Sequence, residues 1–178
     1  MTCIIGIAEH GKVWIGGDSA GVSGWNINPI GKKVFRSGEF LIGVTGNLRA
    51  TQVLQYRLHI ETKADLESED CYMATVFSDE VRSLFLANAL MKKDNEVEKH
   101  DSAFLVGYKG RLYTVDSDMS VVAMPEQFDF VGCANGLARG AFVALDHLQP
   151  FERIKRTLEI VARYNIGVDG PFQIEVLE

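Results

Sequence analysis

The sequence has 178 residues, of which 47% are hydrophobic and 24% are charged, and these are the values of an ordinary globular domain with a sizeable core. Its formal net charge of −6 argues against nucleic acid as the main partner, because phosphate binding requires a clustered positive surface. Every apolar run is shorter than the ~20 residues of a membrane span, and no charged segment precedes a signal-type core. We therefore expect a single domain over residues 1–178, in the cytoplasm and without a membrane partner.

The cysteines give no indication of a cross-linked or metal-bound fold. Cys3, Cys71 and Cys133 lie far apart in the sequence and lack the spacing of a zinc site or of a disulfide framework. We expect reduced thiols, no metal and no other cofactor.

The N-terminal segment is predicted to be a strand that is buried from its first residues. Thr2 is followed at once by an apolar run that includes Ile4, Ile5 and Ile7, with no polar leader before it. Position 2 is small enough to permit removal of Met1, which would leave Thr2 as the first residue. A threonine hydroxyl needs a base to act as a nucleophile, and an α-amino group that titrates near ~8 can serve as one. Thr2 is therefore a candidate nucleophile, although threonine is also a common second residue.

Strands are expected in antiparallel pairs before any helix. A first hairpin is predicted over residues 2–8 and 13–17, followed by a Gly/Ser/Asn-rich loop over 18–31. A second pair of strands is predicted over residues 33–36 and 40–46.

The middle of the chain changes to helical spacing. Asn47 is the expected N-cap of a helix that continues to about residue 62. Apolar residues at helical intervals predict a second helix over 72–93, and the charged residues 94–100 are interpreted as a connector.

The last third repeats the order of strands followed by helices. The predicted elements are strands over 102–108, 111–116, 121–124 and 128–133, helices over 134–148 and 150–164, and a final strand over 172–177. Runs of strands followed by runs of helices favour antiparallel sheets with helices segregated to the outer faces. The expected fold is of the α+β class, a four-layer α/β/β/α sandwich of two antiparallel sheets covered by helix pairs.

A serine-hydrolase interpretation of residues 17–21 is weak. These residues match the G-x-S-x-G pattern with Ser19 as nucleophile. That pattern normally joins a strand to a helix in a mainly parallel sheet, whereas a hairpin precedes it here and an irregular loop is expected after it.

Three other residues lie where predicted strands end near Thr2. Asp18 and Lys33 are commonly a turn residue and a solvated charge, but here they end strands that neighbour the N-terminal one. A lysine held by a carboxylate would lower the proton affinity of the Thr2 hydroxyl and amine. Gly46 could offer its backbone N–H to an oxyanion without obstruction by a side chain.

Several spaced motifs occur in order along nearly the whole chain: T-C-I-I-G-I, G-G-D-S-A, K-K-V-F-R, F-L-I-G-V-T-G and F-V-G-C-A-N-G-L-A-R-G-A-F. Together they resemble the proteasome β-subunit and HslV-type peptidase family of N-terminal-nucleophile hydrolases. The resemblance implies the same α/β/β/α sandwich, with Thr2 as nucleophile, Asp18 and Lys33 as the charge pair that tunes it, and Gly46 as the oxyanion donor.

Two positions differ from the family pattern. Cys133 stands where the family has a serine that helps to orient the N-terminal amine, and a thiol is a weaker hydrogen-bond partner. Asn165 stands where many proteasome subunits have a supporting acidic residue, although HslV-type members also lack that acid. By analogy with the family's specificity positions, Ser19, Ala20 and Thr45 would wall the substrate pocket.

The resulting hypothesis is a threonine-type endopeptidase that acts on peptides or unfolded proteins through an acyl-enzyme on Thr2. No propeptide is expected before Thr2, so that Met1 removal alone would expose the amine. The resemblance implies homo-oligomeric stacked rings and allows an ATPase unfoldase as a partner. The alternatives are a catalytically idle ring subunit, favoured by Cys133 and Asn165, and an amidohydrolase of the same fold that acts on small amides.

Overall fold

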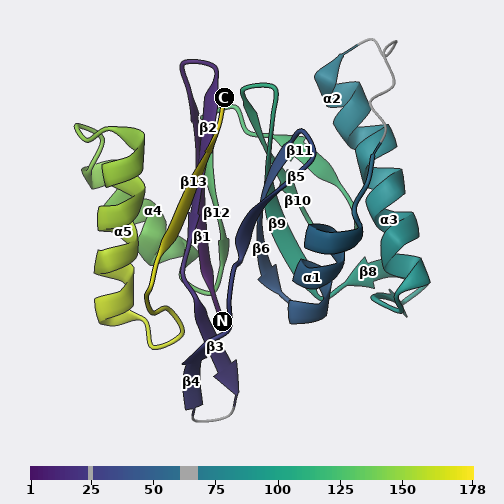
Figure 1. Cartoon of the computed structure of the whole chain (residues 1–178), viewed down its shortest axis with the longest axis horizontal. Coiled ribbons are helices and arrows are strands. Elements are labelled where there is room, and N and C mark those ends of the chain that lie inside the picture. Colours follow the sequence, from purple (N-terminus) through teal and green to yellow (C-terminus); the bar gives the residue numbers. More distant parts are fainter. Residues whose placement is uncertain (24–25, 61–67) are drawn as a thin grey trace.

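The computed structural model describes residues 1–23, 26–60 and 68–178, and two antiparallel sheets packed face to face form its centre (Figure 1). The four-stranded sheet has the order β12 (Phe128–Gly132), β1 (Cys3–Glu9), β2 (Lys12–Gly17) and β13 (Gln173–Leu177). The five-stranded sheet has the order β11 (Val121–Ala123), β10 (Arg111–Val115), β9 (Ser102–Tyr108), β6 (Phe40–Gly46) and β5 (Val34–Ser37).

Helices cover the outer face of each sheet, which confirms the predicted four-layer sandwich (Figure 1). The five-stranded sheet is covered by α1 (Leu48–Arg57), α2 (Glu69–Tyr72), a π-helical turn (Met73–Phe77) and α3 (Ser78–Ala87). The four-stranded sheet is covered by α4 (Asn135–Ala144) and α5 (Pro150–Tyr164). Among the described residues, none of the helices combines the length and the apolar character needed to cross a bilayer.

Strand β1 is buried on both faces, which explains its nearly continuous apolar sequence. Ile4 points into the core between the two sheets, where it packs with Ile15 and Leu41. Its neighbours Cys3 and Ile5 point the other way, into the core beneath α4 and α5. Because successive side chains of a strand alternate between its faces, such a central strand needs apolar residues at every position.

The loop expected over residues 18–31 contains a short hairpin instead. Strands β3 (Ala20–Ser23) and β4 (Asn26–Pro29) pair antiparallel, and Gly21 faces Asn28. Gly and Asn are typical of turns, and this composition concealed the pairing. The hairpin projects beside the N-terminus at one end of the sandwich (Figure 1).

The connector expected over residues 94–100 is also part of a hairpin, formed by β7 (Met91–Asp94) and β8 (Val97–His100). The helix predicted over 72–93 therefore ends early, at Ala87. Ala89 has φ +56°, a left-handed conformation that is common just after a helix. Leu90 lies in the turn after α3 but packs on the same core as the helix, so its position in the sequence continued the helical spacing of apolar residues.

Helix boundaries elsewhere differ from the prediction by several residues. Asn47 caps α1 as expected, because its side chain accepts a hydrogen bond of 2.8 Å from the backbone N–H of Arg49. The helix ends at Arg57 instead of near residue 62, and residues 61–62 lie outside the described part of the chain. α4 ends at Ala144, four residues before its predicted end, whereas α5 has its predicted bounds.

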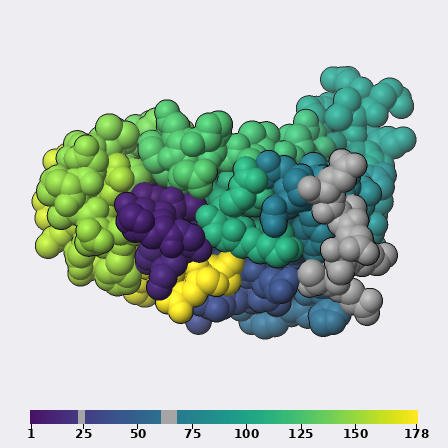
Figure 2. Space-filling view, turned by 90° about the horizontal axis from the view of Figure 1, so that it is seen from above, coloured from purple at the N-terminus to yellow at the C-terminus, as the bar shows by residue number. Residues whose placement is uncertain are grey.

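The two ends of the chain lie at opposite ends of the sandwich (Figure 1). Figure 2 shows the C-terminal residues beside the tip of the β1–β2 hairpin, where Lys12 Nζ lies 2.6 Å from Glu178 Oε1. The N-terminus emerges at the other end, next to the β3–β4 hairpin. That end carries the candidate site.

Candidate active site

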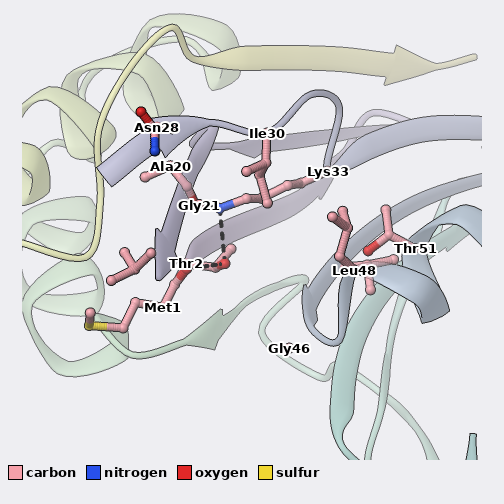
Figure 3. Close-up of a pocket in the computed structure, with 12 residues that line it drawn as sticks. Met1, Thr2, Ala20, Gly21, Asn28, Ile30, Lys33, Gly46, Leu48 and Thr51 are labelled. Carbon is pink, nitrogen blue, oxygen red and sulfur yellow. Dashed lines mark hydrogen bonds between the residues drawn. The ribbon is translucent and has the colours of Figure 1, made fainter. Parts of the chain in front are cut away.

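Lys33 is the centre of a buried polar cluster at the start of β1. Its Nζ atom donates hydrogen bonds to Asp18 Oδ2 at 2.8 Å, to the carbonyl oxygen of Ala20 at 2.7 Å and to Thr2 Oγ1 at 3.0 Å. The side chain is 5% exposed and that of Asp18 is fully buried, so this ion pair is shielded from water. The three protons of the ammonium are thus all directed at acceptors, and one of these is the Thr2 hydroxyl (Figure 3).

Asp18 connects the lysine to the N-terminal strand. Its Oδ1 accepts a hydrogen bond of 2.8 Å from the backbone N–H of Cys3, and its Oδ2 accepts one of 2.9 Å from the N–H of Ala20. The residue directly follows β2, the hairpin partner of β1, and this position brings its carboxylate under the first residues of the chain. Two backbone donors and one ammonium satisfy the buried charge, as a buried carboxylate requires.

Thr2 is held by its backbone as well as by its side chain. The residue is only 4% exposed, and its carbonyl oxygen accepts a hydrogen bond of 2.9 Å from the N–H of Cys133. A Cβ atom at Gly132, which has φ +118°, would lie 2.1 Å from that carbonyl oxygen. Only glycine fits this close approach, and the sequence analysis did not single out Gly132 although it lies in the F-V-G-C motif.

Met1 occupies the space on one side of Thr2. Its carbonyl oxygen accepts a hydrogen bond from the Thr2 hydroxyl. Its side chain packs over Gly167, where a Cβ atom would lie 2.4 Å from Met1 Cβ. With Met1 in place, the nitrogen of Thr2 is an amide and cannot act as a base.

Cys133 and Asn165 lie together at the edge of this site. Cys133 Sγ is 3.5 Å from the carbonyl oxygen of Thr2 and 3.7 Å from Asn165 Oδ1. Asn165 Oδ1 also accepts a hydrogen bond of 2.9 Å from the N–H of Gly167. The two residues that differ from the family pattern are thus adjacent to one another and to the first residues of the chain.

Cys3 is the other thiol close to the N-terminus. Burial, and next the nearby carboxylate of Asp18, raise the pKa of the Cys3 thiol to about 12. The side chain therefore stays protonated at neutral pH and is a poor nucleophile. Cys3 contributes to the core beneath α4 and α5 instead.

A pocket of about 320 Å³ opens beside Thr2. Figure 3 shows Met1 on one side of Thr2, and Leu48 and Thr51 of α1 on the other. Ile30 and Gly46 also line it, and Gly46 has φ +102° at the end of β6.

Of the three expected pocket residues, the structure places only Ala20 in the lining of this pocket. Ser19 is 2% exposed, and its hydroxyl has no hydrogen-bond partner among the described residues. Thr45 is half-buried, and its neighbours Val44 and Gly46 line the pocket instead. Sequence reasoning missed Ile30, Leu48 and Thr51, because the sequence gives no sign of which pocket a loop or helix residue will border.

The described residues around the cluster are not arranged as a metal centre. Within residues 1–23, 26–60 and 68–178, no group of three or more His, Cys, Asp or Glu side chains is placed to hold a metal ion. The groups next to Thr2 include one cation, one carboxylate and backbone amides, and a pocket opens beside them. They can activate a hydroxyl and stabilise a developing negative charge.

No protein-family model matches the sequence, and neither does any curated protein sequence. Solved structures match in fold over nearly the whole chain. BPH from Thiobacillus denitrificans in complex with epoxomicin has a TM-score of 0.80 at 17% identity, covering 99% of this chain and 98% of its own. Eukaryotic HslV from Trypanosoma brucei has a TM-score of 0.69 at 16% identity, covering 99% of both chains.

A third structure, Anbu (ancestral beta-subunit) from Yersinia bercovieri, has a TM-score of 0.68 at 16% identity, covering 98% of this chain and 81% of its own. This chain therefore shares its fold with the HslV, Anbu and BPH structures. At 16–17% identity the likeness concerns the fold, and the chemistry has to be argued from the side chains.

Proposed function

We propose that this protein is a threonine peptidase of the N-terminal-nucleophile type, which cleaves peptide bonds through an acyl-enzyme on Thr2. The observation that carries the proposal is the hydrogen bond of 3.0 Å from Lys33 Nζ to Thr2 Oγ1. A buried ammonium directed at a hydroxyl favours its deprotonated form, and this is what a threonine nucleophile requires. A purely structural ion pair would not need the hydroxyl of the second residue as its third acceptor.

The proposed reaction begins after removal of Met1, which frees the α-amino group of Thr2. That amine accepts the hydroxyl proton as Oγ1 attacks the carbonyl carbon of the substrate, and Lys33 stabilises the alkoxide. The amine then gives the proton to the leaving nitrogen as the peptide bond breaks. A water molecule, activated by the same amine, hydrolyses the ester and restores Thr2.

Gly46 is the proposed oxyanion donor. It lines the pocket and has a left-handed backbone conformation. A donor on the backbone is fixed before the reaction starts, so it stabilises the tetrahedral oxyanion without the cost of reorganisation. Cys133 is proposed as a positioning residue, because its thiol and its N–H both lie next to the carbonyl of Thr2.

The first test uses the N-terminal residue itself. The intact mass of the purified protein shows whether Met1 is lost, and only the Met1-free form should hydrolyse fluorogenic peptides. Thr2→Ala should abolish hydrolysis and labelling by epoxyketones, whereas Thr2→Ser should keep part of both because it retains the hydroxyl. Full activity in Thr2→Ala would disprove the proposal.

We also propose a homo-oligomer of stacked rings that encloses the Thr2 sites, in the cytoplasm. Exposed apolar side chains on the outer helices support this, namely Leu86 on α3, Leu137 and Val143 on α4 and Phe151 on α5. Rings closed by symmetry would bury such faces. Mass photometry at micromolar concentration should show a particle of at least about ten subunits. A monomer would remove the enclosed chamber and favour the small-amide hydrolase.

A further inference from the structure

A second pocket, of about 410 Å³, adjoins the pocket beside Thr2. It lies between the loop of residues 30–32 and one side of α1. The two pockets share Ile30, Leu48 and Thr51 in their linings. The second pocket therefore adjoins the pocket beside Thr2 along these three residues.

The second pocket differs from the first in its polarity. Apart from the shared residues, its lining consists of Gly31, Lys32, Gln52, Gln55 and Tyr56. Lys32 supplies a positive charge, and the amides and the phenol supply hydrogen-bond donors. No carboxylate is found among the described residues that line it.

The two consecutive lysines serve different pockets. The ammonium of Lys33 is fully engaged by Asp18, the Ala20 carbonyl and Thr2, so it has no proton left for a substrate carboxylate. Lys32 is exposed and borders the second pocket, and no ion pair joins it to another described residue. A negative group in this region would therefore meet Lys32.

The position of Met1 shows which part of a substrate reaches the second pocket. Met1 is attached to the nitrogen of Thr2, which has to protonate the leaving amine, so the leaving group departs on the Met1 side. Leu48 and Thr51 lie on the opposite side of Thr2 (Figure 3). The second pocket lies beyond them and therefore adjoins the acyl part of the substrate.

We propose that the second pocket is a subsite for a carboxylate on the acyl side of the scissile bond, so that the substrates are peptides with an acidic side chain there. This inference rests on the proposed peptidase function. A glutamate at either of two substrate positions would supply this carboxylate. One is the residue whose carbonyl is attacked, with its side chain reaching past Leu48, and the other lies two residues towards the substrate's N-terminus. Both positions are considered because alternate side chains of an extended peptide share a face and lie about 6.6 Å apart.

The test measures binding without turnover, using the Met1-free Thr2→Ala variant and fluorescent peptides that contain only the acyl part. Glutamate is compared with glutamine at each of the two positions, since glutamine has the same shape without the charge. We expect the glutamate peptide to bind roughly threefold to fivefold more tightly at one of the positions, as for a partly exposed ion pair. The ratio should fall as salt is raised from 50 to about 500 mM.

Lys32→Met should reduce the glutamate-to-glutamine ratio to about one, because it keeps the length of the stem and removes the charge. Lys155→Met is the matched control: it removes the same charge from α5, on the other outer layer, and should leave the ratio unchanged. A ratio of about one at both positions in the parent protein, or a ratio that persists in Lys32→Met, overturns the inference. Failure of the Thr2 protein to hydrolyse any peptide counts against the proposed function alone, because binding is measured separately.

Discussion

Lys33→Met is the substitution that tests the proposed site most directly, because it removes the ammonium and keeps most of the stem. The change leaves the carboxylate of Asp18 without its cation while 0% of that side chain is exposed to solvent. Breaking a buried ion pair from one side costs about 3–5 kcal/mol. The N–H groups of Cys3 and Ala20 still hold the carboxylate, so we expect a loss of stability near the lower end, about 3 kcal/mol.

The same substitution should lower turnover by a factor on the order of one hundred or more, because Thr2 Oγ1 loses the donor that favours its deprotonated form. Stability is measured by urea unfolding and activity by hydrolysis of a fluorogenic peptide, both on the Met1-free protein. The two effects are separated by the double variant Asp18→Asn with Lys33→Met, which contains no buried charge. It should regain part of the lost stability and none of the lost activity.

The stability and activity of these variants distinguish a catalytic lysine from a structural one. If Lys33 only supported the fold, activity would return together with stability in the double variant. Turnover that is unchanged in Lys33→Met, or restored in the double variant, would refute the role proposed for the hydrogen bond to Thr2.

Three further predictions follow from other contacts. Gly46→Ala should destabilise the fold by about 1–3 kcal/mol and reduce activity, because Gly46 has φ +102° and a Cβ atom there would lie 2.2 Å from a backbone carbonyl oxygen. Gly140→Ala is the control: it lies on an open helix face and should stabilise the fold by up to about 1 kcal/mol in the same urea assay. Ser19→Ala should leave peptide hydrolysis intact, because the hydroxyl is buried without a partner among the described residues; an inactive variant would revive the serine-nucleophile reading. Burial lowers the pKa of His100 below 6.5, so the folded state binds fewer protons than the unfolded state. Stability should therefore fall as the pH drops below about 6.5. His100→Phe should flatten this dependence in urea midpoints measured from about pH 7.5 to about pH 5.5.

Much of the architecture could be predicted from the sequence, because burial leaves a periodic pattern along the chain. The apolar run after Thr2 indicated a strand buried from its first residues, and Asn47 indicated the start of a helix. The order of strand runs and helix runs was sufficient for the four-layer sandwich. Thr2, Asp18 and Lys33 were also recognised as candidates, since each stands at the end of a strand in a chemically suitable motif.

The tertiary structure alone decided where those candidates meet and what surrounds them. Lys33 lies 31 positions from Thr2, and only the packing of the strands brings its Nζ to 3.0 Å from the hydroxyl. The lining of the pocket beside Thr2 includes Ala20, Ile30 and Leu48, and it includes neither Ser19 nor Thr45. Periodicity reports whether a side chain is buried, but its neighbours depend on which elements pack together. Pocket walls and hydrogen bonds between distant residues therefore become visible only in the folded chain.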